Sequence, residues 1–227
     1  MKILALLFGL LFICAFIYFY KPFSYLEARK SLTRSGNKII ALTFDDGPVP
    51  ATVKLLDMLD EVGIKATFFV IGEELSRHPD IIRKAFDSGH VIANHSWSHP
   101  RLLGFRSIHS MKEQIEKTNA ELKKININTP YMRAPFGQSS FRLKKLLRVY
   151  NMKHIHWTIS TKDWKLNYSP EKVRAVFSNI RNSEIILMHD RAYEKPENLE
   201  ALKTEILRLK KEGFTFDIGP TWYWMPD

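Results

Sequence analysis

The sequence predicts an α/β fold, an irregular or incomplete (β/α) barrel of about seven strands, preceded by one N-terminal transmembrane helix. Strand-like and helix-like segments alternate from about residue 37 onward, and such repeated units imply parallel strands joined by right-handed crossovers. About seven units in roughly 190 residues fit an incomplete barrel, and a doubly wound open sheet is the alternative.

The first strand–helix unit carries the clearest pattern. Residues 37–45 are rich in β-branched and apolar side chains, and Leu55, Leu56 and Leu59 follow at helical spacing until Gly63 ends the helix. On the same reasoning, the predicted strands cover residues 37–45, 66–71, 90–94, 131–134, 154–159, 184–188 and 214–218. The predicted helices cover residues 51–61, 79–88, 108–124, 140–149, 170–180 and 199–212.

The composition describes one folded domain with an appendage. Of 227 residues, 45% are hydrophobic and 12% aromatic, which is enough to build a core. The formal net charge is +10, but no nucleic-acid motif and no long Lys/Arg block accompany it. We attribute the charge to solvated helix faces and expect no nucleic-acid partner and no obligate protein partner. The single cysteine, Cys14, excludes an internal disulfide framework and a Cys-based zinc site.

The uncharged run from Ile3 to Tyr20 predicts a membrane anchor. As a helix it would reach ~27 Å, nearly the thickness of a bilayer core. A cleavable signal peptide is the competing interpretation, but residues 16–20 are bulky and offer no small-x-small cleavage site; a buried core helix is the third. Basic residues flank the run on both sides, so the positive-inside rule does not fix its orientation. The predicted organisation is an anchor at residues 1–20, a linker at 21–36 and a folded domain at 37–227.

Polar residues suited to catalysis follow the ends of five predicted strands. In a barrel, these strand ends meet at the face where enzymes build their sites from separate loops. The residues are Asp45, Asp46, His95, His99, Arg133, Asp163 and His189.

Two of these groups indicate a metal site. His95 and His99 are four residues apart, and one aspartate would complete a 2-His-1-carboxylate set. The histidine spacing alone is weak evidence, and the same set serves non-haem iron oxygenases. If one carboxylate of the Asp45-Asp46 pair binds a metal, the other is placed to take a proton from water. An Asp-Gly-Pro turn capped by Asp46 is the simpler interpretation, but it leaves Asp45 unexplained.

Five short motifs occur in order between residues 37 and 217. They are TFDDGP at residues 43–48, HSWSH at 95–99, RAPFG at 133–137, DW at 163–164 and LMH at 187–189. Together they resemble the five motifs of the polysaccharide deacetylases of carbohydrate esterase family 4. Five motifs in order are a specific signal, whereas each alone would be weak to moderate.

The resemblance implies roles for the residues that match. Asp46, His95 and His99 correspond to the metal ligands, and Asp45 to the catalytic base. Arg133 would pair with Asp45 and keep it ionised and oriented. Considered alone, Arg133 could equally be a surface arginine before a proline.

The resemblance also implies residues for leaving-group protonation and acetyl binding. His189 corresponds to the general acid, and Asp163 to the carboxylate that orients it and raises its pKa. The backbone N–H of Phe136 would help to bind the oxyanion, and Trp164 and Leu187 would line a groove for the acetyl methyl. Without the other motifs, His189 would be interpreted as a core histidine, and core packing explains Trp164 and Leu187 equally well.

One position departs from the family pattern. Ser160 stands where the family usually has a further aspartate, three positions before Asp163, which puts the support around Arg133 or the adjacent loop in doubt. Three further histidines, His90, His154 and His156, match no motif and are attributed to strand packing.

The resemblance therefore implies a hydrolase that uses a divalent metal, with zinc as the first choice. It would remove N-acetyl groups from N-acetylglucosamine-type residues of a polysaccharide or peptidoglycan. The alternatives are an O-acetyl esterase acting on an acetylated polysaccharide and an inactive sugar-binding module, which the retained ligands and base disfavour. The expected partners are an acetylated glycan and, through the N-terminal helix, a membrane, with the catalytic domain on the extracytoplasmic side.

Overall fold

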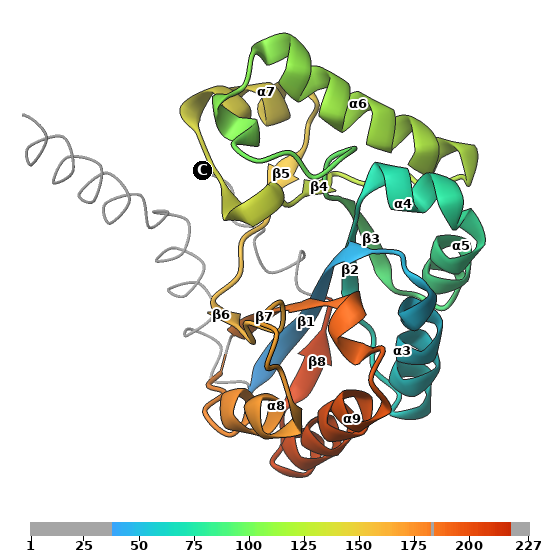
Figure 1. The fold of residues 1–227 in the computed structure, drawn as a ribbon, viewed down its shortest axis with the longest axis vertical. Helices are drawn as coiled ribbons and strands as arrows, with labels where there is room; N and C mark the ends of the chain where they lie inside the picture. The colour runs from blue at the N-terminus through green and yellow to red at the C-terminus, as the bar shows by residue number, and fades with distance from the viewer. Residues whose placement is uncertain (1–37, 183, 219–227) are drawn as a thin grey trace, which may run out of the picture.

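Parallel strands form the centre of the molecule (Figure 1). The computed structural model describes residues 38–182 and 184–218. The strand order is β5-β4-β3-β2-β1-β7-β6, and β8 pairs with β1. The strands are β1 (Ile39–Gly47), β2 (Thr67–Val70), β3 (Val91–Asn94), β4 (Tyr131–Met132), β5 (Lys153–His154), β6 (Ile159–Ser160), β7 (Glu184–His189) and β8 (Thr215–Asp217).

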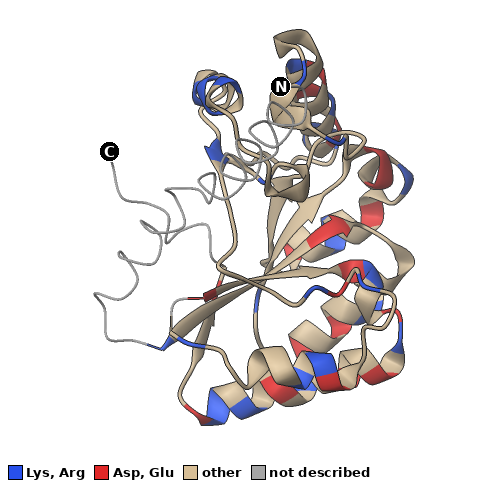
Figure 2. Ribbon diagram, turned by 60° about the vertical axis from the view of Figure 1, so that its left-hand side comes forward, with Lys and Arg blue, Asp and Glu red and all other residues tan. Residues whose placement is uncertain are grey.

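Helices lie around the outside of this sheet (Figure 1). They are α3 (Pro50–Glu61), α4 (Gly72–Arg77), α5 (Pro79–Asp87), α6 (Ile108–Lys124), α7 (Phe141–Val149), α8 (Pro170–Phe177) and α9 (Pro196–Lys211), with short 3-10 turns η1 (Leu103–Phe105), η2 (Pro135–Gly137) and η3 (Asp190–Tyr193). Figure 2 shows Lys and Arg along these helices, interspersed with Asp and Glu on most of them, as expected for solvated helix faces.

The barrel is open between β5 and β6. These strands are consecutive in the chain, but in the described residues β5 pairs only with β4 and β6 only with β7. The amide of Ile155 still bonds to the carbonyl of Met132 at 2.7 Å, and three residues later the amide of Thr158 bonds to the carbonyl of Ile185 at 2.9 Å. The chain thus crosses from one end of the sheet to the other. The predicted incomplete barrel is confirmed, whereas a single strand at residues 154–159 is wrong.

Alternation along β1 separates the helical core from the barrel interior. Ile40, Leu42 and Phe44 are buried against the surrounding helices in the main hydrophobic cluster. The intervening residues Thr43 and Asp45 face the interior, where they contact a buried arginine instead of a layer of aliphatic side chains. This polar interior lies directly beneath the rim that carries the predicted site.

The other predicted elements agree with the structure to within a few residues. The helix at Ile108–Lys124 has the predicted bounds, while α9 begins three residues early because Pro196 occupies its first turn. The short helix α4 was not predicted, since its six residues are too few for a helical repeat to be recognised. The predicted anchor and linker lie outside the described residues, and no helix within the described part is long and apolar enough to cross a membrane.

Candidate active site

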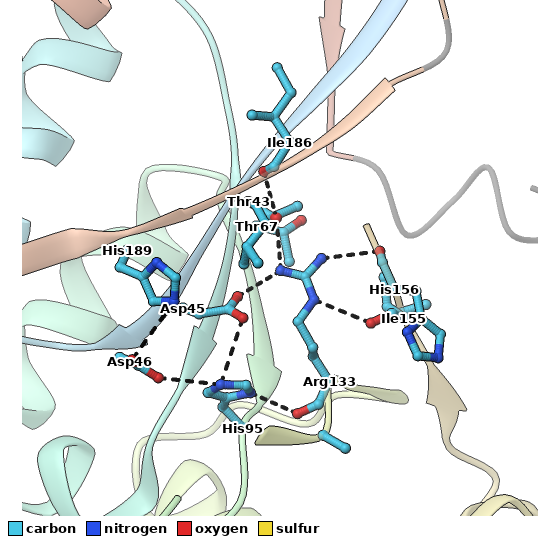
Figure 3. A network of polar contacts seen from close by, with 12 residues as sticks. Thr43, Asp45, Asp46, Thr67, His95, Arg133, Ile155, His156, Ile186 and His189 are labelled. Atoms are coloured by element: carbon cyan, nitrogen blue, oxygen red, sulfur yellow. Dashed lines mark hydrogen bonds and ion pairs between the residues drawn. The ribbon is translucent and has the colours of Figure 1, made fainter. Parts of the chain in front are cut away.

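Asp45 and Asp46 diverge at the end of β1. The register of β1 against β2 shifts between Asp45 and Gly47, and Asp46 has a left-handed backbone with φ of 70°, which aspartate tolerates better than most residues. Asp45 is only 3% exposed, whereas 40% of the Asp46 side chain is exposed. The two neighbouring carboxylates therefore meet different partners, one in the interior and one at the rim (Figure 3).

Asp46, His95 and His99 bring three ligand atoms together. Asp46 Oδ1 lies 3.3 Å from Nε2 of His95 and 3.3 Å from Nε2 of His99, and the three donor atoms lie within 4.8 Å of one another. Oxygen and nitrogen donors at zinc distances around a tetrahedral centre are about 3.3 Å apart. The spacing therefore fits one small divalent cation.

The tautomer of His95 supports the same interpretation. Its Nδ1 lies 2.7 Å from the carbonyl oxygen of Arg133, which only accepts, so in the neutral ring Nδ1 carries the proton and Nε2 presents a lone pair. That lone pair faces Asp46 Oδ1, a buried atom without a hydrogen-bond partner among the described residues. Two facing acceptors are favourable only with a cation between them, and these residues therefore fit a metal ion.

The pKa shifts of Asp46 and His99 favour the protonation states that bind a metal ion. Burial raises the pKa of Asp46, but the neighbouring imidazoles of His95, His189 and His99 outweigh it and hold the pKa below the usual range. Burial lowers the pKa of His99, and the nearby Asp46 only partly offsets this effect. An ionised carboxylate and a neutral imidazole are the forms that bind metal.

Arg133 fixes Asp45 inside the barrel (Figure 3). This arginine is completely buried, and its Nη1 donates to Asp45 Oδ1 at 2.6 Å and to Thr43 Oγ1 at 2.8 Å. Its Nε and Nη2 donate to the carbonyls of Ile155 and His156, both at 3.2 Å. Because Oδ1 of Asp45 is occupied by the guanidinium, Oδ2 is left facing the cavity, 3.6 Å from His95 Nε2.

Asp163 holds His189 on the opposite side of the cluster. Asp163 Oδ1 accepts from His189 Nδ1 at 2.6 Å, and Oδ2 accepts from the backbone N–H of His189 at 2.7 Å. Burial lowers the pKa of His189, but the hydrogen bond and charge of Asp163, with the charges of Asp45 and Asp46, raise it to about 9. The other ring nitrogen, Nε2, lies 3.9 Å from Asp46 Oδ2, so it faces the cluster.

The three predicted substrate-binding residues lie together. Phe136, Trp164 and Leu187 line a cavity of about 380 Å³ that also contains both aspartates, His95, His99 and His189. The Phe136 ring packs on His99 at 4.7 Å, and the edge of Trp164 meets His189 at 5.5 Å. The structure thus brings every predicted site residue to this cavity or to its supporting contacts.

The structure also shows the contacts of Ser160, the position that departs from the family pattern. Ser160 Oγ accepts from the backbone N–H of Lys162 at 3.1 Å and so closes a turn. Support of Arg133 comes from Thr43 and from the backbone carbonyls described above. Thr43 was quoted only as part of a motif, and nothing in the sequence distinguished its hydroxyl from a packed β-strand threonine.

Two further residues of the site were missed. Trp157 lines the cavity and packs so closely on Gly137 that an added Cβ there would lie 2.3 Å from its ring. Asp190 is 1% exposed; its Oδ2 accepts from the hydroxyl of Thr52, which in turn accepts from the N–H of Val49 at 2.9 Å. Asp190 therefore fixes the start of α3, and it lies against Gly47, the residue after Asp46, where an added Cβ would be 2.2 Å from Asp190 Oδ2. Burial raises the pKa of Asp190 to about 7. Its only sequence signal was adjacency to His189.

Comparison with known proteins agrees with this geometry. Residues 33–155 match the family described as polysaccharide deacetylase. A peptidoglycan-N-acetylglucosamine deacetylase of Listeria monocytogenes is 34% identical over 79% of this chain, which spans only 38% of that enzyme's length. A peptidoglycan-N-acetylmuramic acid deacetylase of Bacillus subtilis is 32% identical, with 82% of this chain and 71% of the enzyme covered. The structure of a family 4 carbohydrate esterase from Streptomyces lividans in complex with acetate gives a TM-score of 0.72 at 29% identity, with 80% of this chain and 93% of that chain covered. The chain therefore belongs to the polysaccharide deacetylases of carbohydrate esterase family 4.

Proposed function

We propose that this protein is a metal-dependent hydrolase that removes N-acetyl groups from N-acetylglucosamine-type residues of a polysaccharide or peptidoglycan. One observation carries the proposal: three side chains whose spacing fits a divalent cation lie beside Asp45, a carboxylate able to accept a proton, and His189, an imidazole able to donate one. Hydrolysis of an amide requires both transfers, because water must lose a proton and the departing nitrogen must gain one.

Each proton transfer has a defined atom in this site. Asp45 Oδ2 faces the cavity, and its partner oxygen is held by Arg133, so Oδ2 is assigned as the acceptor of the proton from the attacking water. His189 Nε2 is assigned as the donor to the sugar nitrogen, since Asp163 binds the opposite ring nitrogen. Phe136 contributes its backbone N–H at the rim, and Trp164 and Leu187 exclude water around the acetyl methyl.

Asp46, His95 and His99 are assigned as the ligands of a divalent ion. When bound, such an ion supplies a Lewis acid that acidifies water and polarises the acetyl carbonyl. Zinc is the proposed ion, because two imidazoles and one carboxylate with open positions form a typical catalytic zinc set. The chain retains all three ligands and the base, which argues against an inactive sugar-binding module.

Removal of the metal is expected to abolish activity and lower stability together. Chelator-treated protein should release no acetate from acetylated oligosaccharides, and zinc should restore release. Because a ligand at a hundredfold its Kd stabilises the native state by about 2.7 kcal/mol, zinc should also raise the melting temperature by about 5–10 °C. Asp46→Ala, the matched control, should show no zinc-dependent rise. Full activity in rigorously metal-free protein would contradict the proposal, and a panel containing O-acetylated glycans would reveal an esterase.

We also propose that residues 3–20 hold the protein at a membrane, with the catalytic domain on the extracytoplasmic side. The support is the uncharged run in the sequence and the polymeric substrate, which lies outside the cytoplasm. Protease added to intact spheroplasts should digest the domain, while a cytoplasmic marker protein survives. Protection until lysis would mean an inverted orientation, and release of the domain without detergent would mean that no anchor is retained.

A further inference from the structure

A second cavity adjoins the proposed active site on the far side of His189. It has a volume of about 350 Å³ and shares Asp46, Trp164 and His189 with the first cavity. The acetyl methyl is assigned to the first cavity, and the sugar nitrogen must face His189. The remainder of the glycan therefore extends toward the second cavity.

Three cations line this second cavity. They are Lys165, Arg191 and Lys195. All three are exposed, and none forms an ion pair with another part of the chain that the structure describes. By contrast, many basic side chains on the helices are paired with nearby acids, such as Lys117 with Glu113 at 2.6 Å. The cations of the cavity are available to a ligand.

The acids of this cavity do not cancel the cations. Asp163 is paired with His189 at 2.6 Å, and the charge of Asp46 would be offset by the cation proposed to bind there. This leaves Glu194 as the one uncommitted carboxylate among the described lining residues, against three cations. The field in the cavity therefore favours an anion.

The backbone that presents these cations is well fixed. Arg191 belongs to η3, whose neighbouring side chains Asp190 and Tyr193 are buried. The carbonyl of Lys195 accepts from the amide of Asn198 at 3.1 Å, and the carbonyl of Lys165 accepts from the amide of Tyr168 at 3.0 Å. The positive charges thus extend from defined positions and not from a loose loop.

Asn198 provides an independent sign of a ligand. It lines the same cavity and is only 2% exposed. Its Nδ2 donates to the carbonyl of Ala192 at 2.9 Å, whereas its Oδ1 has no hydrogen-bond partner within residues 38–182 and 184–218. A buried acceptor of this kind costs free energy unless a donor reaches it, and a sugar hydroxyl is such a donor.

We propose that this cavity is a subsite for an acidic sugar residue of the glycan, with its carboxylate held by Lys165, Arg191 and Lys195. The inference rests on the proposed deacetylase function and narrows its substrate to glycans that carry a carboxylate close to the N-acetyl group that is removed. Arg191 is the principal contact, because its planar guanidinium can bind a carboxylate through two parallel hydrogen bonds.

The test compares two substrates that differ only in the carboxyl group. One is a peptide-free glycan strand of alternating N-acetylglucosamine and N-acetylmuramic acid, and the other is the same strand with its carboxyl groups reduced to alcohols. The zinc-loaded full-length protein should show a kcat/KM about three- to tenfold higher on the acidic strand, mostly through KM. The preference should shrink as salt is raised, because exposed charges are screened.

Variants of the lining residues test whether the preference for the acidic strand arises in this cavity. The triple variant Lys165→Gln, Arg191→Gln, Lys195→Gln should bring the ratio of kcat/KM for the two strands close to one, and Arg191→Gln alone should account for most of the fall. Glu194→Gln should raise the ratio. Arg148→Gln, which removes an exposed arginine of α7 outside both cavities, should leave the ratio unchanged.

Different outcomes test the proposed subsite and the proposed deacetylation separately. Equal rates on both strands, or a preference that survives the triple variant, would overturn the subsite while leaving deacetylation intact. If neither strand releases acetate, the proposed function fails, and calorimetric binding of the two strands still decides the subsite. Equal affinity for the acidic and the reduced strand would then refute it.

Discussion

Asp45→Asn is expected to lower the rate of acetate release by ~10²–10⁴ while the protein keeps its metal. The amide has nearly the shape of the carboxylate and can still accept from Arg133 Nη1, which lies 2.6 Å away, but it cannot take a proton from water. The measurement is kcat beside metal content by elemental analysis. Because the buried Arg133 loses its counter-charge, stability should also fall by about 3–5 kcal/mol, and the assay must be run well below the melting temperature.

Asp46→Ala is the companion variant that separates proton transfer from metal binding. It removes the oxygen that lies 3.3 Å from both imidazoles, so metal and activity should be lost together. Its effect on folding should be smaller than that of Asp45→Asn, since the Asp46 side chain is 40% exposed. A site emptied by Asp45→Asn but still filled in Asp46→Ala would show that the two roles are reversed.

The parts of the fold that follow from local pattern were predictable. The helix at Ile108–Lys124 carries a regular apolar stripe, and its Ser107 caps the N-terminus through the amide of Ser110 at 3.1 Å. The break in residues 154–159 was not predictable, because it depends on which strands the carbonyls and amides of Ile155 and Thr158 can reach across the open barrel. The position of β8 also depends on tertiary structure: it pairs with β1 at Ile39–Ala41, beside the longer pairing of β1 with β2.

The residues proposed to take part in the reaction were more predictable than the residues that hold them in place. Asp46 and His189 could be predicted as site residues because they belong to five motifs that occur in order along the chain and resemble one family. Trp157 and Asp190 could not be recognised, because an aromatic residue in a predicted strand and an aspartate before a turn are common and have ordinary explanations. Their contributions lie in close packing on Gly137 and in a bond to Thr52, 138 positions distant in the chain. Contacts of this range leave no local pattern.

In the barrel interior, one residue contacts both the proposed base and a proposed metal ligand. A closed barrel would be filled by aliphatic layers, but in this chain the guanidinium of Arg133 occupies the interior, with its carbon 3.9 Å from the centre of the Phe69 ring. The same residue orients Asp45 through its side chain and His95 through its backbone carbonyl. One buried residue therefore sets the position of the proposed base and the tautomer of a proposed metal ligand.

Asp163→Asn is expected to move the alkaline limit of activity to lower pH. Burial lowers the pKa of His189, but the pKa is raised to about 9 in the folded protein. The main cause of the rise is the Asp163 carboxylate, which accepts a hydrogen bond from Nδ1 and whose negative charge favours the protonated ring. A proton donor with a raised pKa is charged below that value and loses its proton as the pH rises through it, so activity should fall on the alkaline side. Without the carboxylate, burial dominates and the pKa of His189 drops toward or below its ordinary value near 6.5. A divalent ion held by Asp46, His95 and His99 would repel the imidazolium in both proteins. The quantity to compare is therefore the shift of the alkaline limit between variant and wild type, and not its absolute position.

The size of the effect should depend on the leaving group. At neutral pH, Asp163→Asn and His189→Ala should each lower kcat/KM on an N-acetylated sugar by ~10²–10⁴, and much less on an activated acetyl ester, whose leaving group needs no proton. Stability follows the same sign: the raised pKa of His189 contributes stability that is complete below about 6.5 and is lost as the pH rises through about 9. Asp163→Asn should remove that dependence. Asp60→Asn, which breaks an exposed pair with Lys65, is the control and should leave both pH profiles in place. An unchanged alkaline limb in Asp163→Asn, or equal losses on amide and ester, would show that His189 does not donate the proton.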